Sequence, residues 1–441
     1  MIYEDILKDP DQCSFAVRSL GSCSEASPLR GRRFVDDQDQ ITFASQVKNI
    51  CSLQQRAKVF PAFQKAGPRA KLFHRPVNTR AGIVTCGGLC PGLNNVIKGL
   101  VTVLFHDYNV AIIKGFRYGY QGLVAKYGHA PLDLTSALVD EIHKSGGTIL
   151  GSSRGNQDPG AMVDTLEAMQ INLLFCIGGD GTLRGAKAIA DEIARRKCHI
   201  SVIGIPKTID NDLRFIEKTF GFETAVQAAD EIITCAHNEA EGADNGIGIV
   251  KLMGRDSGFI AAAVTLANSV VDFCLVPEIN FSLEGEHGLC KALERKLAQS
   301  SHAVIVVAEG AGQSLFAGSE AKKDASGNLL KHDIGVFLKD ELGRHLKKLG
   351  QDVSIKYLDP SYHIRSVAAN SADAIFCYLL AENAVHAAMA GITGIVIGHW
   401  NNYFTHVPIE LAIGERQKID LDGALWNGVL SATQQNVFFG I

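Results

Sequence analysis

Short apolar runs alternate with amphipathic stretches along most of the chain, beginning near Arg80. The runs that predict strands are 81–85, 110–113, 171–177, 201–205, 247–252, 271–276, 303–308 and 394–397. Between them lie stretches whose apolar residues recur three and four positions apart, as in 222–237, and these predict helices. Such alternation is typical of parallel sheets covered by helices on both faces. The pattern therefore predicts an α/β protein with two lobes and a cleft between them.

The first 78 residues have a different texture. Pro, Ser, Asp and Gln occur there in short runs, and no clean alternation of strand and helix is visible. We interpret residues 1–78 as an N-terminal extension that wraps the main body. A partly disordered tail would have the same composition, so that alternative stays open.

The composition of the chain excludes several classes of protein. The 441 residues are 46% hydrophobic and 20% charged, and the net charge is −4, without the basic excess of a nucleic-acid binder. No stretch approaches the ~18 uninterrupted apolar residues of a membrane span, and the acidic N-terminus does not resemble a signal peptide. The 11 cysteines contain no CxxC pair, and we expect them to be reduced thiols. We expect a cytoplasmic protein that binds neither membranes nor nucleic acids.

Three of the predicted strands end in loops with candidate chemistry, where ligands bind in open parallel sheets. The first strand is followed by TCGGLCPG (85–92), the third by GGDGT (178–182) and the fourth by PKTIDND (206–212). Glycines between a strand and a helix let backbone N–H groups approach a phosphate. Asp180 can supply an oxygen to a Mg²⁺ ion carried by a nucleotide, and the carboxylates of Asp210 and Asp212 suit a general base with a partner.

Taken alone, the loop at 85–92 fits an ordinary turn better than a phosphate site, and the other two loops fit either equally well. Their convergence on one edge of one sheet favours phosphoryl transfer, in which positioning and neutralisation of charge perform most of the catalysis. Arg154 in GSSRG and Arg255 in MGR could bind phosphate, although each could also be an ordinary surface arginine.

In these residues the chain resembles the phosphofructokinase family. The resemblance runs from about Arg80 to Asn402 and rests on GGLCPGLN, GSSRG, GGDGT, PKTIDND, MGR, AEGAG and SYHIR, in the family's order. It is strongest to the long ATP-dependent enzymes of plants and kinetoplastids, a group related to the pyrophosphate-dependent enzymes. It implies two Rossmann-like three-layer lobes and the committing step of glycolysis, in which Mg-ATP phosphorylates the 1-hydroxyl of fructose 6-phosphate.

The resemblance also implies a division of the chain. Residues 79–220 would form a nucleotide-binding lobe, to which 366–400 return. Residues 221–365 would form the fructose 6-phosphate lobe, and 401–441 a C-terminal segment packed on the body. The resemblance further implies an allosteric homodimer or homotetramer with the sugar site at a subunit boundary, although the effectors cannot be carried over because the extension has no bacterial counterpart.

Roles for individual residues follow from the same resemblance. Asp210 would be the catalytic base, with Arg154 and Arg255 neutralising the transferring phosphoryl group, and Asp180 would hold Mg²⁺. The ATP site would comprise Gly88, Arg154, Gly155, Gly179, Asp180, Gly181 and Thr182. The sugar phosphate site would comprise Thr208, Ile209, Asp210, Met253, Gly254, Arg255, Glu309, Lys356, Tyr362, His363, Ile364 and Arg365.

Two positions bear on the phosphoryl donor. Pyrophosphate-dependent relatives carry Asp where this chain has Gly181, and that side chain would collide with the α-phosphate of ATP. Lys207 matches the pyrophosphate enzymes, whereas short ATP-dependent relatives have Gly there. The plant and kinetoplastid enzymes combine Gly and Lys as this chain does, so we expect ATP, with a reversible pyrophosphate-dependent enzyme as the alternative.

The chain departs from the short bacterial pattern. Two arginines that those enzymes take from a neighbouring subunit correspond to Gly246 and Lys356, and Tyr362 stands in place of a histidine. A catalytically silent regulatory subunit is a second alternative. Such a subunit would be expected to lack Asp210, Asp180 or an arginine of the site, and all are present here.

Overall fold

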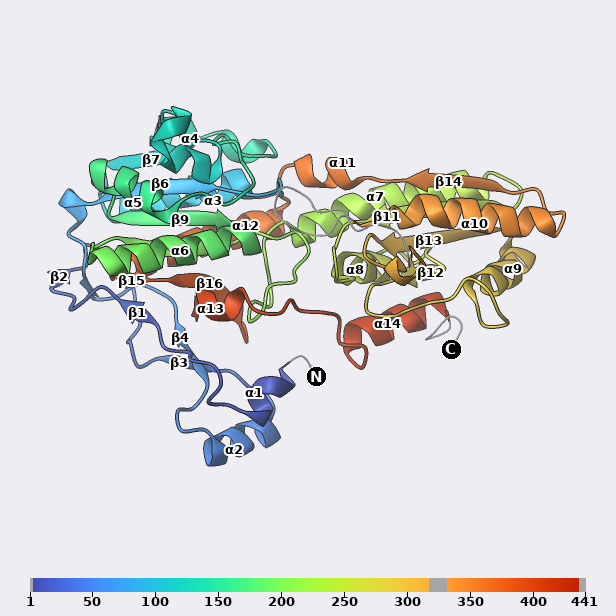
Figure 1. Cartoon of the computed structure of the whole chain (residues 1–441), viewed down its shortest axis with the longest axis horizontal. Helices are drawn as coiled ribbons and strands as arrows, with labels where there is room; N and C mark the ends of the chain where they lie inside the picture. Colours follow the sequence, from blue (N-terminus) through green and yellow to red (C-terminus); the bar gives the residue numbers. More distant parts are fainter. Residues whose placement is uncertain (1–2, 317–330, 436–441) are drawn as a thin grey trace.

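The computed structural model describes residues 3–316 and 331–435 and has two α/β lobes along its long axis (Figure 1). The predicted α/β class with mainly parallel sheets is confirmed. The first lobe is built on a nine-stranded sheet and the second on a four-stranded sheet. Two small antiparallel ladders lie outside them, β1 (Arg18–Ser19) with β15 (Ile392–Thr393) and β2 (Glu25–Ala26) with β5 (Lys71–Leu72).

The large sheet is parallel in its middle and antiparallel at both edges. Its strands are, in spatial order, β3 (Gln40–Thr42), β4 (Ala62–Lys65), β17 (Tyr403–Pro408), β16 (Ile395–Trp400), β10 (Ser201–Pro206), β9 (Leu173–Gly178), β6 (Arg80–Thr85), β7 (Ile112–Phe116) and β8 (Leu132–Asp133). The neighbouring parallel strands β10, β9 and β6 place the three candidate loops at one edge.

Helices cover both faces of this sheet because its central strands are apolar on both sides. Ile83 faces α3 (Leu93–Thr102) and α12 (Ser371–Met389), which pack against each other. Val84 points to the opposite face, which is covered by α5 (Pro159–Ala168), α6 (Asp180–Arg196) and the short α13 (Ile409–Ala412). The alternating side chains of each strand thus enter two separate cores. A short helix, α4 (Ser136–Val139), packs beside α3.

The second lobe repeats the three-layer plan. Its parallel sheet has the order β12 (Phe273–Leu275), β13 (His302–Ala308), β11 (Gly246–Leu252) and β14 (Ser354–Leu358). The helices α7 (Phe222–Glu241) and α8 (Phe259–Ala267) cover one face, and α9 (Leu289–Ser300) and α10 (Ile334–Lys348) cover the other. Both α7 and α11 (Ser361–Ser366) lie at the junction of the lobes (Figure 1).

Both ends of the chain contribute helices and strands to the body. The N-terminal segment contains α1 (Glu4–Lys8) and α2 (Val47–Arg56), and its β3 and β4 extend the large sheet beyond β17. The C-terminal segment supplies β17 to the first lobe, then crosses to the second lobe, where α14 (Ala424–Thr433) packs on α8 (Figure 1). Residues 436–441 lie outside the described residues.

The strand predicted at 110–113 begins two residues later in the structure. The apolar run 110–113 belongs only in part to β7, which begins at Ile112. Asn109 has a φ of 56°, and the backbone N–H of Val110 donates to the carbonyl of Leu104 at 2.9 Å, so the chain is still turning out of the preceding helix there. Among the described residues, no helix combines the length and the apolar character needed to cross a membrane.

Candidate active site

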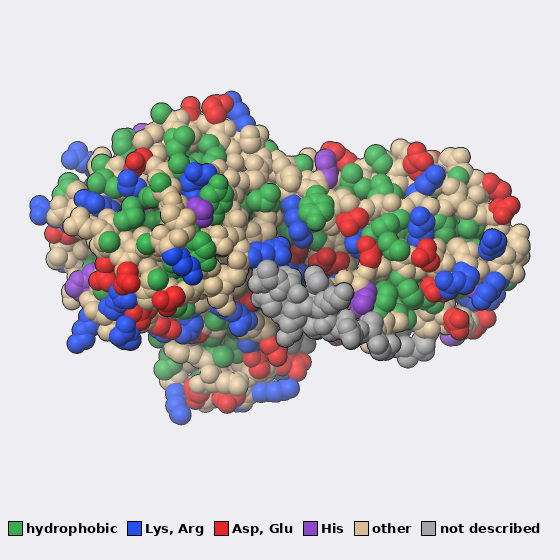
Figure 2. All heavy atoms as spheres, turned by 45° about the horizontal axis from the view of Figure 1, so that its top comes forward, with side chains coloured by type: hydrophobic (Ala, Val, Ile, Leu, Met, Phe, Trp, Pro, Cys, Tyr) green, Lys and Arg blue, Asp and Glu red, His purple; other side chains and the backbone are tan. Residues whose placement is uncertain are grey.

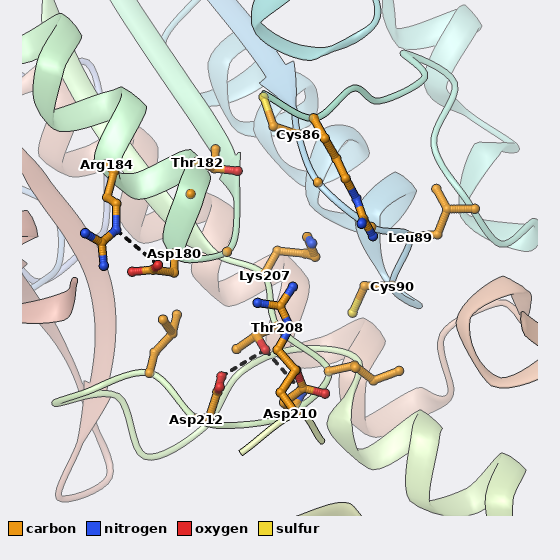
Figure 3. A pocket seen from close by; sticks show the side chains of 18 of the residues that line it. Cys86, Leu89, Cys90, Asp180, Thr182, Arg184, Lys207, Thr208, Asp210 and Asp212 are labelled. Carbon is orange, nitrogen blue, oxygen red and sulfur yellow. Dashed lines mark hydrogen bonds and ion pairs between the residues drawn. The ribbon is translucent and has the colours of Figure 1, made fainter. Parts of the chain in front are cut away.

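A cavity of about 550 Å³ opens at the carboxyl ends of β6, β9 and β10 (Figure 3). The first lobe supplies most of its wall, and the second lobe adds Arg255, which follows β11, while Arg365 comes from α11. The cavity therefore lies where the two lobes meet. On the face seen in Figure 2, acidic and basic side chains are interspersed over both lobes rather than gathered in one stripe.

Backbone hydrogen bonds join the loops that form the cavity floor. The N–H of Cys86 donates to the carbonyl of Ile177, and that of Lys207 to the carbonyl of Gly178, both at 3.0 Å. The N–H of Gly87 donates to Ser153, at 3.0 Å, which ties in the loop that carries Arg154. The expected convergence of the loops at 86–92, 178–182 and 206–212 is thus observed.

Glycines keep the floor open for an anion. Gly87 has a φ of 86°, and a Cβ added there would stand 3.3 Å from Nζ of Lys207. A Cβ added at Gly181 would meet no other atom within 4 Å. Gly181 lies in the first turn of the 17-residue helix α6, whose N-terminus opens onto the cavity. Free N–H groups and the helix dipole at this end favour a phosphate.

Asp180 is the candidate magnesium ligand. Its Oδ2 accepts a hydrogen bond from Nε of Arg184 at 3.1 Å, and both side chains line the cavity (Figure 3). A single carboxylate facing space for phosphate oxygens fits a magnesium ion that arrives with a nucleotide and keeps several waters. Within residues 3–316 and 331–435, no cluster of three or more His, Cys, Asp or Glu could hold a metal by itself.

Asp210 has the properties of a general base. It is 8% exposed, and its backbone N–H donates to Oγ1 of Thr208 at 3.2 Å, which in turn donates to Oδ1 of Asp212 at 3.1 Å (Figure 3). Burial, reinforced by the charges of Asp212 and Glu309, raises the pKa of Asp210 to about 7, although Arg255 and Arg365 oppose the shift. A carboxylate with a pKa near neutrality accepts a proton efficiently at neutral pH.

Positive charges surround these carboxylates. The cations that line the cavity are Arg154, Arg184, Lys207, Arg255, Arg365 and Arg416. Lys207 is 7% exposed, and burial lowers its pKa despite the nearby Asp210. Arg255 has a left-handed backbone with a φ of 51°, and its N–H donates to Oε1 of Glu309 at 3.0 Å.

The structure brings together most of the predicted site residues. Those lining the cavity are Gly88, Arg154, Gly155, Gly179, Asp180, Gly181, Thr182, Lys207, Thr208, Ile209, Asp210, Arg255 and Arg365. Those that do not line it are Met253, Gly254, Glu309, Lys356, Tyr362, His363 and Ile364.

The seven predicted residues outside the cavity wall differ in how deeply they are buried. The side chains of Met253 and Ile364 are packed in the core, and Gly254 is buried as well, so the predicted contacts of all three with the sugar phosphate stay a prediction. Lys356, Tyr362 and His363 are instead exposed, and Tyr362 is 85% exposed. Their role in sugar binding stays a prediction. Glu309 reaches the site indirectly, through its bond to the backbone of Arg255.

Two arginines of the cavity were missed at the sequence level. Arg184 could have been found, because it follows Asp180 by four positions on a helix and such pairs meet on one face. Arg416 gave no such signal. It lies in the crossing between the lobes, 204 positions from Asp212, the carboxylate with which it pairs.

The fold and the site define a class: two-lobed α/β phosphotransferases that hold a polyphosphate at the ends of parallel strands, beside a buried carboxylate. The chain belongs to the phosphofructokinase family, whose model, described as "Phosphofructokinase", matches residues 80–388. The predicted family is therefore confirmed.

Relatives of known name support this membership. The ATP-dependent 6-phosphofructokinase of Borreliella burgdorferi is 46% identical over 97% of this chain and 98% of its own. The enzyme of the same name from Trypanosoma brucei brucei is 46% identical over 91% of this chain and 82% of its own. ATP-dependent 6-phosphofructokinase 7 of Arabidopsis thaliana is 48% identical over 86% of this chain and 78% of its own. The expected similarity to plant and kinetoplastid members is confirmed.

Solved structures show the same fold at lower identity. A pyrophosphate-dependent phosphofructokinase from Marinobacter aquaeolei superposes with a TM-score of 0.66 at 20% identity, covering 81% of this chain and 91% of its own.

Proposed function

We propose that this protein is an ATP-dependent 6-phosphofructokinase, which converts fructose 6-phosphate and Mg-ATP into fructose 1,6-bisphosphate and ADP. One observation carries the proposal. The buried carboxylate of Asp210 shares a cavity with the open N-terminus of α6 at Gly179–Thr182, one strand away. A proton acceptor and a phosphate cradle are thus held side by side.

Each cavity residue would have its own role in the phosphoryl transfer. Asp210 takes the proton of the sugar 1-hydroxyl as that oxygen forms its bond to the γ-phosphorus. The bond between the γ-phosphorus and the β–γ bridging oxygen breaks, and ADP leaves with the electron pair. Arg154 and Arg255 neutralise charge on the transferring group, and Lys207 adds a cation beside Asp210.

Magnesium, when bound with the nucleotide, would neutralise the phosphate oxygens, and Asp180, which lines the cavity, would hold it. Arg184 donates to one oxygen of that carboxylate, and the other has no hydrogen-bond partner within residues 3–316 and 331–435. The loop glycines Gly87, Gly88 and Gly179 let backbone N–H groups approach the phosphates, while Arg154 stands next to Gly88.

ATP is the proposed donor rather than pyrophosphate. Gly181 leaves open space where a side chain would project, and the Borreliella, trypanosome and plant relatives are named as ATP-dependent enzymes. Lys207, the feature shared with pyrophosphate enzymes, lies against Gly87 and faces Asp210, so its position is compatible with either donor.

We further propose a cytoplasmic homodimer or homotetramer whose sugar phosphate site is completed between subunits. Arg365 lines the cavity, whereas its neighbours Tyr362 and His363 in α11, and Lys356 in β14, point to the surface. Their exposure would allow a second copy of the chain to contact them. The eleven cysteines are free thiols, which is compatible with a reducing compartment.

A coupled assay with purified protein tests the proposal. Fructose 6-phosphate should be phosphorylated with Mg-ATP, and turnover with pyrophosphate should be at least about a hundredfold lower. Activity with pyrophosphate alone would refute the choice of donor. Binding of fructose 6-phosphate without turnover with either donor would identify a silent regulatory subunit instead.

A further inference from the structure

The cavity contains an arginine to which the family resemblance assigned no role. Arg416 lies in the segment 413–423, which leaves α13 in the first lobe and reaches α14 in the second (Figure 1). It lies beyond the residues 80–388 that match the family model, yet it lines the cavity with Asp210 and Arg255. The crossing segment therefore reaches the candidate active site directly.

The crossing segment is bonded to both lobes. In the first lobe, the backbone N–H of Gln417 donates to the carbonyl of Asp212 at 2.9 Å, and its side-chain amide donates to the carbonyls of Leu213 and Ile216. In the second lobe, the N–H of Ile419 donates to Oε1 of Glu278 at 2.9 Å. The same oxygen accepts from the N–H of Gly258, just after Arg255, at 3.1 Å.

Arg416 is connected to Asp210 by a chain of hydrogen bonds. Its guanidinium donates to Oδ2 of Asp212, a side chain only 1% exposed. The other oxygen of Asp212 accepts from the hydroxyl of Thr208, and that hydroxyl accepts from the backbone N–H of Asp210. One oxygen of Asp212 is thus bonded to the guanidinium of Arg416, and the other is bonded to Thr208 in the loop that carries Asp210.

We propose that Arg416 is a positioning residue for phosphoryl transfer: it neutralises and fixes Asp212, so that Asp210 stays in place and ionised. The inference rests on the proposed function. Without Arg416, Asp212 would be a buried carboxylate without its cationic partner beside a second buried carboxylate, an arrangement in which like charges disfavour ionisation. Asp210, which must be ionised to accept a proton, would then be protonated up to a higher pH.

Several other charges act on Asp210. The carboxylates are Asp212 and Glu309, and the cations are Lys207, Arg255, Arg365 and Arg416. The thiol of Cys90 is also near, but burial raises its pKa and keeps it neutral. Arg416 is the member of this group that pairs with Asp212 directly, and its own pKa is raised by that carboxylate although burial opposes the shift.

The test is the pH profile of kcat/KM for fructose 6-phosphate, measured on the full chain with saturating Mg-ATP. We expect Arg416→Gln to shift the acid limb, the range in which kcat/KM rises with pH, upward by about half to one pH unit. The loss should be about five- to fifteenfold near pH 6.5 and shrink to about twofold near pH 9. Arg416→Lys should keep the wild-type limb, because a lysine preserves the charge.

Two matched controls come from the same segment. Lys418→Gln removes the same charge at an exposed neighbouring position and should leave the profile unchanged. Gln417→Ala removes the side-chain hydrogen bonds that attach the segment to the first lobe and leaves the charge unchanged. It should lower kcat/KM at every pH and leave the acid limb at its wild-type pH. A uniform loss of rate in Arg416→Gln, with the limb in its wild-type place, would show a merely structural role and overturn the proposal.

The double variant Arg416→Gln/Asp212→Asn covers the case in which the single variant does not fold. It removes both charges, and its limb should return to the wild-type position or below; a limb that stays raised would overturn the proposal. An active Arg416→Gln enzyme with an unchanged profile would overturn the role of Arg416 and leave the proposed function standing. A wild-type protein that turns over neither donor would overturn both.

Discussion

The backbone N–H of Arg255 donates a hydrogen bond to Oε1 of Glu309 at 3.0 Å, across 54 positions of sequence. The bond joins the loops that follow β11 and β13, two neighbouring parallel strands of the second lobe. Arg255 needs such support because its φ of 51° lies in the left-handed region, which is unfavourable for a residue with a side chain.

Substituting Glu309 should therefore impair the site through Arg255. We expect Glu309→Ala to lower kcat/KM for fructose 6-phosphate by about ten- to a hundredfold, the order expected when a positioned group is misplaced. Glu309→Gln keeps an acceptor oxygen and should lose less. Steady-state kinetics with each substrate varied in turn are the measurement, and equal effects of the two variants would contradict the importance of the hydrogen bond.

Asp210→Asn should lower turnover by about a hundredfold or more, because an amide cannot take the proton of the sugar hydroxyl. The substitution keeps the size of the side chain, so binding of fructose 6-phosphate should survive. Calorimetric titration with that sugar phosphate and a kcat measurement separate the two effects. A variant with near-full turnover would refute the role given to Asp210.

The activity should also fall in mild acid. The pKa of Asp210 is raised to about 7, so its carboxylate is ionised above that pH and protonated below it. We expect kcat/KM to rise with pH through an acid limb near 7 and then level off, since this parameter reports groups of the free enzyme. A profile that is flat from about pH 6 to about pH 8 would contradict the assignment.

The same shift has a consequence for stability. The pKa of Asp210 is higher in the folded protein than in the unfolded protein, so ionisation favours the unfolded state. The free energy of unfolding therefore falls as the pH rises from about 4, where the unfolded group ionises. It stops falling above about pH 7, where the folded group is ionised as well. Asp210→Asn removes this loss of stability. The variant should be more stable than the wild type at pH 8, by at most about 4 kcal/mol, and the difference should vanish toward pH 4. Urea titrations at both pH values measure it.

The sequence predicted the middle of the first lobe well because that region is organised locally. Residues 81–85 and 201–205 are continuous apolar runs, and they became β6 and β10 with ends shifted by one residue. The site loops follow such strands directly, so their convergence could be inferred from the parallel sheet alone.

The other strands and the missed arginine depend on contacts between distant parts of the chain, which a local sequence pattern cannot predict. β14 was missed because Ser354–Leu358 is short and carries polar residues within the strand, including the exposed Lys356. β3 and β4 pair with each other, and β4 pairs with the distant β17, so propensity within 1–78 could not reveal them. Arg416 meets Asp212 only because the chain crosses back between the lobes after β17.

Gly181→Asp is the variant that tests the basis for the choice of donor. The added side chain meets no protein atom near its Cβ, so the fold should be preserved, while its charge and bulk enter the phosphate cradle. We expect kcat/KM with ATP to fall by about a hundredfold or more, as when a like charge is placed against a ligand. Gly181→Ala, which adds little bulk and no charge, is the matched control. Retained use of ATP by Gly181→Asp would remove the steric argument for ATP.

The N-terminal segment should contribute to catalysis through Tyr3. Its ring stacks on that of Phe215 with centroids 4.9 Å apart, and its hydroxyl accepts from the N–H of Phe215 at 3.4 Å. Phe215 is fully buried with a φ of 62°, in the loop that continues from Asp210 and Asp212. Tyr3 therefore supports a turn with left-handed backbone in the same loop as the candidate base.

Tyr3→Ala should lower the free energy of unfolding by about 1–3 kcal/mol, less than a large-to-small change in a full core because Tyr3 stays partly exposed at the edge of its aromatic cluster. Tyr3→Phe keeps the stacked ring and should cost less than about 1 kcal/mol. Because the ring of Tyr3 also supports the loop, kcat should fall in Tyr3→Ala but not in Tyr3→Phe, at temperatures where both variants are fully folded. Equal kcat in all three proteins, with a lowered Tm only in Tyr3→Ala, would limit the segment to stabilising the fold.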